Sequence, residues 1–503
     1  MNGGLMVCGT TSDSGKSTVV TGLCRLLARR GVRVAPFKAQ NMALNSAVTP
    51  EGHEIGRAQA AQAQAAGVAP EAAMNPILLK PTSDRTSQVM LMGRPWAVLD
   101  AAGYQQAKAE LWPLVIGQLE GLKDRYDVVV CEGAGSPSEI NLLENDVVNL
   151  RVAEAARFPA LLVGDIDRGG VFAALFGTVA LLPDAWRGLV RGFVINKFRG
   201  DPALLADGPA ELERRTGIPT LGVLPWLDDV GIDAEDSLAL RTGWARHRPA
   251  GAECLDVAVV RFPHISNFTD LDALAVEPQV RIRVVESPAS LGQPDLLILP
   301  GSKSTVADLA WLRATGLATA ICDLPESRPG STILGVCAGY QILGRQIEDE
   351  VEAPNPCRVA GLGLLPVRTV FGPDKLTMVV AGTALGHPVT GYEIHHGWTE
   401  PSRPWMELGT GPEGSRAFDG AVLGTSVHGL FEADAFRHEF LAAVARRAGR
   451  SWTRSTVSFA AARAARFDRL ADALEQHLDV AAISALIEGS TSRGRPAVRE
   501  RSA

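Results

Sequence analysis

Short apolar runs alternate with amphipathic helical segments along the first half of the chain. Two segments, Val19–Ala28 and Ala107–Leu122, place their apolar residues at helical spacing. Strands that alternate with helices predict a parallel sheet covered on both faces. Four runs have the length and composition of buried strands, and a glycine-rich or acidic turn follows each: Leu5–Cys8, Asp127–Cys131, Ala160–Val163 and Gly192–Ile195.

A second strand–helix series begins after an acidic, then Arg- and Gly-rich stretch that has no clear period. The chain is therefore predicted to be an α/β protein with two doubly wound domains and mostly parallel sheets. Its expected strands are Asp256–Val260, Arg281–Val285, Asp295–Leu299 and Thr332–Val336. The predicted organisation is a first domain at 1–230, a linker at 231–254, a second domain at 255–450, a helical extension at 451–488 and a disordered tail at 489–503.

Composition narrows the class of protein. The chain has 503 residues, too many for one core, with 46% hydrophobic and 21% charged residues. A net charge of −7 argues against a nucleic-acid partner, and no apolar window is long enough to cross a bilayer. The seven cysteines are scattered without a Cys-x-x-Cys pair, which favours a reducing cytoplasm. Oligomeric state cannot be inferred from the sequence.

The most informative stretch is a Gly-x-Cys-x-Gly turn centred on Cys337, between an apolar strand and a helix. Glycines on both sides permit a sharp turn that we expect to push the thiol out into solvent as a nucleophile. The helix N-terminus that follows would favour the thiolate. His428 precedes Gly429 after a strand-like run, so it is the candidate base, although a lone histidine is often a satisfied core residue.

A second strand-to-loop corner, Pro300–Lys303, offers the backbone N–H groups of Gly301 and Ser302, with that of Ala338, as an oxyanion hole. Together with Cys337 and His428, this pattern resembles the class I, triad-type glutamine amidotransferases. The resemblance implies a flavodoxin-like fold and a role for Gln341 in holding the substrate glutamine. The family's His-x-Glu acid is replaced by Leu430, with Glu432 nearest, which leaves either a dyad or another acid orienting the histidine.

The N-terminal loop Gly9–Ser17 follows the first strand and opens a helix, so its N–H groups would face phosphate. Lys16 would reach the β- and γ-phosphates, and the Ser17 hydroxyl would bind Mg²⁺. The expected ATP-binding residues here are Gly9, Thr10, Asp13, Ser14, Gly15, Lys16, Ser17 and Thr18. The loop resembles that of the dethiobiotin synthetase family, which implies ATP used to phosphorylate a carboxylate.

Other polar residues end neighbouring strands of the first domain. Glu132, before three small residues, is a second Mg²⁺ ligand candidate. Lys38 fits a phosphate or carboxylate contact and, equally, a solvated strand end. Asn196, with Lys197, would contact adenine, or would merely form a turn. A substrate or phosphate site, with a plain turn as the alternative, is predicted at Asp165, Asp167 and Arg168.

A carboxylate-activating ATPase fused to a glutaminase implies amide synthesis from glutamine-derived ammonia. Four strings, Phe37–Ser46, Asn75–Pro81, Asp165–Phe172 and Gly391–His395, give the chain a resemblance to the cobalamin-pathway amidotransferases, and within them to the cobyric acid synthase family, to about residue 445. The resemblance implies four ATP-dependent amidations, of the b, d, e and g carboxylates of adenosylcobyrinic acid a,c-diamide. It also implies that Gln40 and Asn41 contact the substrate, and that Tyr392–His396 faces the corrinoid or the domain junction.

Two rival hypotheses remain at this point. The a,c-diamide synthases of the same pathway share both motifs and amidate two carboxylates. A P-loop ATPase with an inactive amidotransferase-like binding module belongs to a different class, and the missing His-x-Glu acid is what keeps it open.

Overall fold

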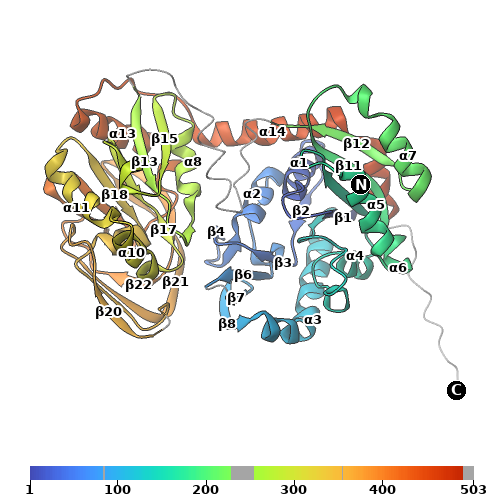
Figure 1. The fold of residues 1–503 in the computed structure, drawn as a ribbon, viewed down its shortest axis with the longest axis horizontal. Helices are drawn as coiled ribbons and strands as arrows, with labels where there is room; N and C mark the ends of the chain where they lie inside the picture. The colour runs from blue at the N-terminus through green and yellow to red at the C-terminus, as the bar shows by residue number, and fades with distance from the viewer. Residues whose placement is uncertain (83–84, 228–253, 354, 491–503) are drawn as a thin grey trace.

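The computed structural model describes residues 1–82, 85–227, 254–353 and 355–490. Two α/β bodies lie side by side, and one long helix connects them along one edge (Figure 1). The first body is built on a six-stranded sheet with the order β12-β11-β10-β1-β9-β2. All of its strand pairs are parallel: β1 (Gly3–Gly9), β2 (Val34–Phe37), β9 (Val128–Glu132), β10 (Ala160–Asp165), β11 (Val190–Phe198) and β12 (Thr220–Pro225).

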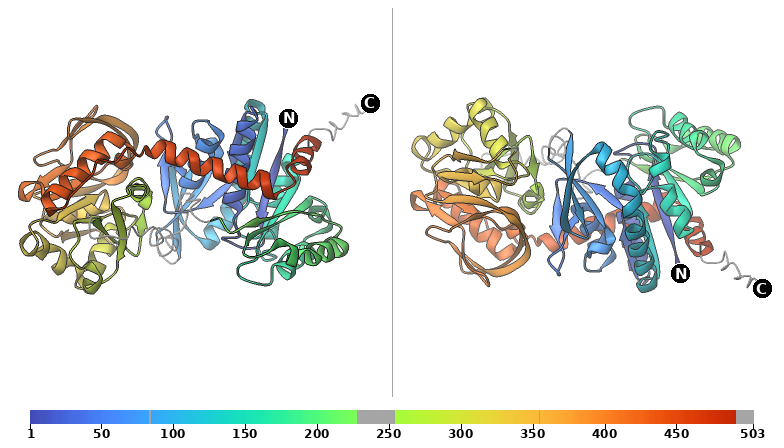
Figure 2. Two further views of the ribbon diagram at one scale, coloured as in Figure 1. Left: turned by 90° about the horizontal axis from the view of Figure 1, so that it is seen from above. Right: turned by 90° about the horizontal axis from the view of Figure 1, so that it is seen from below.

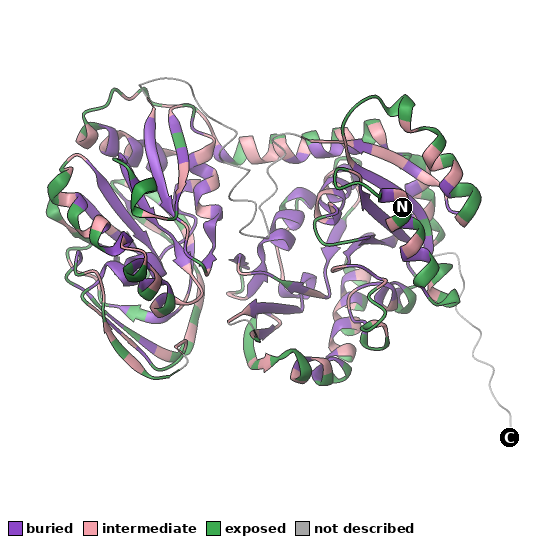
Figure 3. Ribbon diagram, in the orientation of Figure 1, coloured by how far each residue is buried: buried purple, intermediate pink, exposed green. Residues whose placement is uncertain are grey.

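Alternate residues of β1 enter two different hydrophobic cores, which confirms that both faces of this sheet are covered. Leu5 and Val7 pack with α1 (Lys16–Arg29), whereas Met6 and Cys8 pack with α3 (Ala101–Arg125). Figure 3 shows the central strands buried between exposed outer helix faces. The remaining helices of this body are α2 (Arg57–Ala66), α4 (Leu150–Ala156), α5 (Val171–Leu181), α6 (Asp184–Arg187) and α7 (Asp207–Thr216).

The second body has its own six-stranded sheet, of order β15-β13-β16-β18-β26-β25, and only the β25–β26 pair is antiparallel. The predicted fold class is thus confirmed. The strands are β13 (Leu255–Val260), β15 (Val280–Val285), β16 (Leu296–Leu299), β18 (Thr332–Val336), β25 (Ser415–Ala417) and β26 (Val422–Thr425). The helices are α8 (Asp272–Ala275), α9 (Pro288–Leu291), α10 (Thr305–Ala314), α11 (Leu317–Ser327), α12 (Ala338–Leu343) and α13 (Asp434–Ala448).

Each body also carries strands that the alternating pattern did not predict. The first has a four-stranded sheet of β3 (Gln40–Met42), β6 (Ile77–Pro81), β7 (Thr86–Leu91) and β8 (Arg94–Asp100), and a hairpin of β4 (Ser46–Val48) and β5 (Glu54–Gly56). The second has a mostly antiparallel sheet, dominated by the long pair β21 (Arg368–Ala384) and β22 (His387–Thr399). Its other strands are β19 (Gln346–Asp349), β20 (Cys357–Ala360), β23 (Met406–Leu408) and β24 (Gly411–Glu413); β14 (Ile265–Ser266) pairs with β17 (Gly301–Ser302).

The C-terminal segment returns to the first body (Figure 2). It consists of two helices, α14 (Phe459–His477) and α15 (Val480–Gly489), because the Asp479 side chain caps a new helix by accepting from the Ala482 N–H at 2.9 Å. Arg25 and Arg29 of α1 form ion pairs with Asp468 and Asp472 of α14. The last helix ends beside β1, where the Ser490 hydroxyl accepts a hydrogen bond from the Gly4 N–H at 3.0 Å.

Two predicted segments fall largely outside the described residues: the linker at 231–254, of which only Cys254 is described, and the tail at 489–503, described only for Gly489 and Ser490. Within the described ranges, no helix is long and apolar enough to cross a membrane.

Candidate active sites in the two domains

The N-terminal loop turns tightly around the start of α1. Gly15, with φ of 98°, precedes the helix, and a Cβ there would lie 1.9 Å from the Asn196 amide nitrogen, so only glycine fits. Lys16 folds back over the loop, and its Nζ donates to the carbonyls of Thr11 at 3.0 Å and Gly135 at 3.2 Å. Ser14 Oγ is buried and has no hydrogen-bond partner in the described part of the chain. The loop is thus a preformed cradle with an unused polar atom.

Asn196 and Lys197, at the end of β11, hold this loop from behind. The Asn196 side-chain amide donates to the Ser14 carbonyl at 3.0 Å. Lys197 Nζ donates to the Asp13 carbonyl at 2.6 Å and to the Asp165 carboxylate at 2.8 Å. In this geometry both residues support the loop backbone, a contact that no local sequence pattern predicted.

Glu132 is the centre of a buried polar cluster beneath the loop. Its Oε1 accepts from Ser17 Oγ at 2.9 Å and from Lys38 Nζ at 2.8 Å, and its Oε2 accepts from Gln62 Nε2 at 2.5 Å. Burial opposes ionisation of Glu132, but the Lys38 ammonium outweighs it and lowers the pKa of the carboxyl. The Lys38 side chain is 5% exposed, so the solvated strand-end alternative is wrong.

The remaining predicted polar residues lie around the same sheet edge. Arg168 reaches both Asp13, at 3.4 Å, and Asp165, at 3.6 Å, while Asp167 pairs with Arg199 at 3.1 Å. On β3, Gln40 Oε1 accepts from the Tyr104 hydroxyl at 2.6 Å, and Asn41 Nδ2 donates to Gln59 Oε1 at 2.9 Å.

The other predicted residues of the phosphate loop lie at its two ends. Thr10 directly follows β1, and Thr18 lies in the first turn of α1. A larger residue in place of Gly9 would collide with the loop, because a Cβ there would lie 2.2 Å from Ser14 Oγ.

In the second body, the chain turns sharply at Cys337, whose φ of 52° and ψ of −109° are a strained combination for a residue with a Cβ. The turn depends on the glycines beside it. A Cβ at Gly335 would lie 2.6 Å from the Gly339 backbone, and a Cβ at Gly339 would lie 1.8 Å from the Leu299 carbonyl oxygen. The predicted strand–turn–helix is therefore observed, with β18 before the cysteine and α12 after it.

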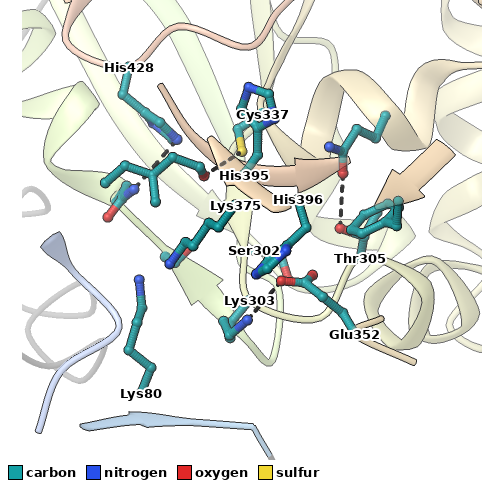
Figure 4. A pocket seen from close by; sticks show the side chains of 15 residues that line it. Lys80, Ser302, Lys303, Thr305, Cys337, Glu352, Lys375, His395, His396 and His428 are labelled. Atoms are coloured by element: carbon teal, nitrogen blue, oxygen red, sulfur yellow. Dashed lines mark hydrogen bonds and ion pairs between the residues drawn. The ribbon is translucent and has the colours of Figure 1, made fainter. Parts of the chain in front are cut away.

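The expectation that this turn pushes the thiol into solvent is wrong. Cys337 is only 7% exposed, and its Sγ lies 3.9 Å from the carbonyl oxygen of Ile394. Strand β22 passes over the turn and encloses the sulfur in a pocket, shown in Figure 4. The nucleophile candidate thus works inside a chamber, where solvent is restricted.

His428 lies beside the thiol and is oriented by an acid that the sequence reasoning missed. Asp270 Oδ2 is 2.7 Å from His428 Nδ1, and Asp270 Oδ1 accepts from the Gly429 N–H at 2.8 Å. Burial disfavours the imidazolium, but the Asp270 carboxylate prevails and, with the neighbouring Cys337, raises the pKa of His428 to about 10. Because Asp270 precedes the histidine by 158 residues, no local spacing pointed to it.

Glu432, the acid nearest to His428 in sequence, is engaged elsewhere. It pairs with Arg57 of α2 at 3.3 Å and with Arg463 of α14 at 2.8 Å. The Glu432 carboxylate therefore links its own loop to α2 and α14, and Asp270 is the acid that contacts the His428 imidazole.

The predicted oxyanion loop lies in the same chamber. Gly301 and Ser302 form β17, which pairs with β14, and the Ser302 hydroxyl donates to Asp308 at 2.5 Å. A Cβ on Gly301 would lie 3.1 Å from the His428 ring, so the loop backbone runs directly beside the base. Ala338 begins α12 next to the thiol, and Gln341, which is 4% exposed, lines the pocket with its Oε1 accepting from Thr305 at 3.1 Å.

The first body completes this chamber from the other side. Asn267 accepts a hydrogen bond from the Ser46 N–H at 2.9 Å, and its Nδ2 lies 3.5 Å from His428 Nε2. Tyr392 stacks on the His428 ring with a 5.3 Å centroid separation and donates its hydroxyl to the Ser46 carbonyl at 3.2 Å. Lys80 of the first body is one of the residues that line the pocket. The predicted position of Tyr392 at the domain junction is thus observed.

A buried ion network crosses the same junction. Glu54, on β5 of the first body, pairs with Lys80 of that body and with Lys375 of the second, the latter at 2.5 Å. Burial opposes ionisation of Glu54, but the two ammonium groups prevail and hold its pKa far below the ordinary value. Burial likewise lowers the pKa of Lys375 to about 8, against the attraction of Glu54.

Comparison with known proteins identifies the class to which these two sites belong. Residues 5–239 match the CobQ/CobB/MinD/ParA nucleotide binding domain, and residues 256–436 match the CobB/CobQ-like glutamine amidotransferase domain. The chain therefore joins a P-loop nucleotide-binding domain to a glutamine amidotransferase domain.

Close relatives then identify the family. The chain is 51% identical to the cobyric acid synthase of Frankia casuarinae over 99% of both chains. It is also 51% identical to that of Saccharopolyspora erythraea, over 98% of this chain and 96% of the relative, and 46% identical to that of Yersinia enterocolitica, over 97% and 98%. The chain belongs to the cobyric acid synthase family.

Proposed function

We propose that this protein converts the b, d, e and g carboxylates of adenosylcobyrinic acid a,c-diamide into amides, using ATP and glutamine. Residues 1–230 would be the ATP-dependent amidoligase and residues 255–450 the glutaminase. The observation that carries the proposal is the pairing of a preformed phosphate loop with a Cys337–His428–Asp270 arrangement on one chain. The domains that carry them meet at a shared junction, so a nitrogen donor and an activated acceptor belong to the same molecule.

In the glutaminase half, Cys337 would transfer its proton to His428 Nε2 and attack the amide carbon of glutamine. Backbone N–H groups of Gly301, Ser302 and Ala338 would stabilise the oxyanion. The imidazolium would return the proton to the departing nitrogen, which leaves as ammonia. Water would then cleave the thioester, so that glutamate leaves and the thiol is restored. Asp270 would keep Nδ1 protonated throughout.

In the amidoligase half, a corrinoid carboxylate oxygen would attack the γ-phosphorus of ATP and expel ADP, which forms an acyl phosphate. Ammonia would attack the acyl carbon and release phosphate, so each amide consumes one ATP and one glutamine. Lys16 would neutralise charge on the phosphates. Lys38 would bind the acceptor carboxylate or the transferred phosphoryl group. Asp165, Asp167 and Arg168 would border this site.

The donor set near the loop also fits Mg²⁺. The Ser17 hydroxyl and a Glu132 carboxylate oxygen lie 2.9 Å apart, and both are the hard oxygen ligands that this ion prefers. They would hold the ion, which supplies neutralisation of phosphate charge. Lys38 and Gln62 would keep the Glu132 carboxylate fixed for that purpose.

The decisive experiment follows the corrinoid by mass spectrometry after incubation with adenosylcobyrinic acid a,c-diamide, Mg-ATP and glutamine. Four successive amide additions, with four glutamines consumed per corrinoid, are expected. If the a,c-diamide stays unchanged, and cobyrinic acid supplied in its place gains two amides, the protein is an a,c-diamide synthase. Absence of glutaminase activity in the presence of both ATP and corrinoid would contradict the proposed chemistry altogether.

A further inference from the structure

The chamber around Cys337 contains an ion pair that amide hydrolysis itself does not use. Lys303 Nζ lies 2.7 Å from Glu352 Oε1, and the two side chains are only 9% and 13% exposed. Both line the pocket that contains Cys337, and Figure 4 shows them converging on it. The hydrolytic steps need a nucleophile, a base and oxyanion donors, so these buried charges are available to bind the substrate.

A neutral hydrogen-bond acceptor lies in the same wall. His396 is 8% exposed, and its Nδ1 lies 3.3 Å from the Gly372 carbonyl oxygen, which places the proton on that nitrogen. Burial, together with the nearby ammonium groups, lowers the pKa of His396. Its Nε2 is buried and has no hydrogen-bond partner among the described residues, although His396 lines the pocket. The imidazole therefore keeps an unused acceptor lone pair at the wall of the pocket.

Two lysines beside this chamber compete for one carboxylate. Lys80 and Lys375 share the single carboxylate of Glu54, and Lys303 is balanced by Glu352. A buried cation without a full counter-ion is costly, and an anionic ligand group would offset that cost. The chamber thus offers buried cations, a carboxylate and a neutral acceptor, which is the complement of an α-amino acid.

We propose that Lys303, Glu352 and His396 bind the α-amino acid end of glutamine and so select the nitrogen donor. Lys303 binds the α-carboxylate, while Glu352 and His396 Nε2 accept from the α-ammonium. The ion pair between Lys303 and Glu352 opens to take one charged group each, and it closes again when glutamate leaves. Three carbon–carbon bonds separate the amide carbon of glutamine from its α-carbon, and Lys303, Glu352 and His396 all line the pocket that contains Cys337. This inference rests on the proposed glutaminase activity.

Two glutamine analogues test each charge separately. 4-Carbamoylbutanoate lacks the α-amino group, and 4-aminobutanamide lacks the α-carboxylate. Ammonia release would be measured as kcat/KM for glutamine and both analogues, with wild type, Glu352→Gln, Lys303→Met and His396→Phe. Arg358→Met is the matched control, since it removes an exposed ion pair with Glu348, of 2.9 Å, on the same domain.

The expected result is a crossed pattern. Glu352→Gln loses about 10²-fold on glutamine and little on 4-carbamoylbutanoate, because the lost contact is to the absent amino group. Lys303→Met loses as much on glutamine and little on 4-aminobutanamide. His396→Phe follows the Glu352→Gln pattern with a smaller loss, and Arg358→Met matches wild type throughout.

Equal losses on all three substrates would overturn the proposal and indicate that the pair only supports the fold. Unchanged selectivity in both charge variants would overturn it as well, even with glutaminase and corrinoid amidation intact. A wild-type enzyme that releases no ammonia from glutamine would overturn the subsite together with the proposed function. Amidation supplied with ammonium chloride bypasses the chamber, so a variant that also loses this activity is misfolded, and Lys303→Arg and Glu352→Asp then repeat the test.

Discussion

The two candidate sites differ in what holds them together. Among the described residues, the phosphate loop is supported by groups of its own domain, with Asn196 and Lys197 behind it and Glu132 beneath it. The thiol chamber is instead completed by the neighbouring domain, through Ser46 and Lys80. The described contacts of one site thus come from a single domain, whereas the other site depends on domain association.

This difference suggests how nitrogen loss is limited. A glutaminase that worked in isolation would release ammonia to solvent, where it is protonated and lost. Because Asn267 and Tyr392, which both contact His428, are held by the Ser46 backbone of the first domain, the base is fully framed only in the assembled molecule. We expect the substitutions that follow to affect the two sites differently, in decreasing order of effect.

Cys337→Ala should lower glutamine-dependent amidation by about 10³-fold or more, because the thioester cannot form. Ammonium chloride should restore amide formation, since the phosphate site does not rely on this residue. Mass spectrometry of the corrinoid with each nitrogen source is the measurement. A variant that fails with both sources would show that the two sites are not separable.

Lys16→Met should lower amidation by on the order of 10²- to 10³-fold with either nitrogen source, since an electrostatic contact to the phosphates is lost. Phosphate release in the presence of corrinoid gives the rate. Lys123→Met is a matched control, because that lysine pairs with Glu120 on α3 at 2.7 Å. Normal activity of Lys16→Met would show that this loop does not bind the reacting phosphates.

Asp270→Asn should lower glutaminase kcat by about 10²-fold, because the imidazole loses its orienting carboxylate. It should also change the pH profile. A raised His428 pKa keeps the imidazolium protonated, and the thiolate–imidazolium pair is lost as pH rises through that value of about 10. Without Asp270 the pKa falls, so the alkaline limb of kcat/KM moves to lower pH. An alkaline limb that stays in place would assign the orienting role to another group.

Tyr392→Phe should have the smallest effect, about 1 kcal/mol or up to roughly 10-fold, because it removes one hydroxyl contact to Ser46 and keeps the stacked ring. We expect the loss to appear in coupling, as more glutamine hydrolysed per amide formed. Tyr126→Phe, which removes a hydroxyl contact to Glu71 elsewhere in the first domain, is the control. Identical coupling in both variants would show that this junction contact is dispensable.

Local sequence patterns predicted the two parallel sheets, the phosphate loop and the thiol turn, because each depends on neighbours in the chain. Contacts between distant segments were beyond such patterns. Asp270 meets His428 only because η6 (Phe268–Leu271) packs against η8 (Leu430–Glu432), and the burial of Cys337 depends on β22. The antiparallel strands were missed because β21 and β22 alternate exposed and buried residues within a region expected to continue the strand–helix series.

The return of α14 and α15 to the first body has a consequence for synthesis. Leu474 and Ile487 fill the same core as Leu5 and Val19, so the first domain emerges from the ribosome with this core only partly filled, by α1 and α2. The core is completed only when α14 and α15 are made, after the entire second domain. The chain cannot finish one domain before starting the other, and the two catalytic halves are completed together.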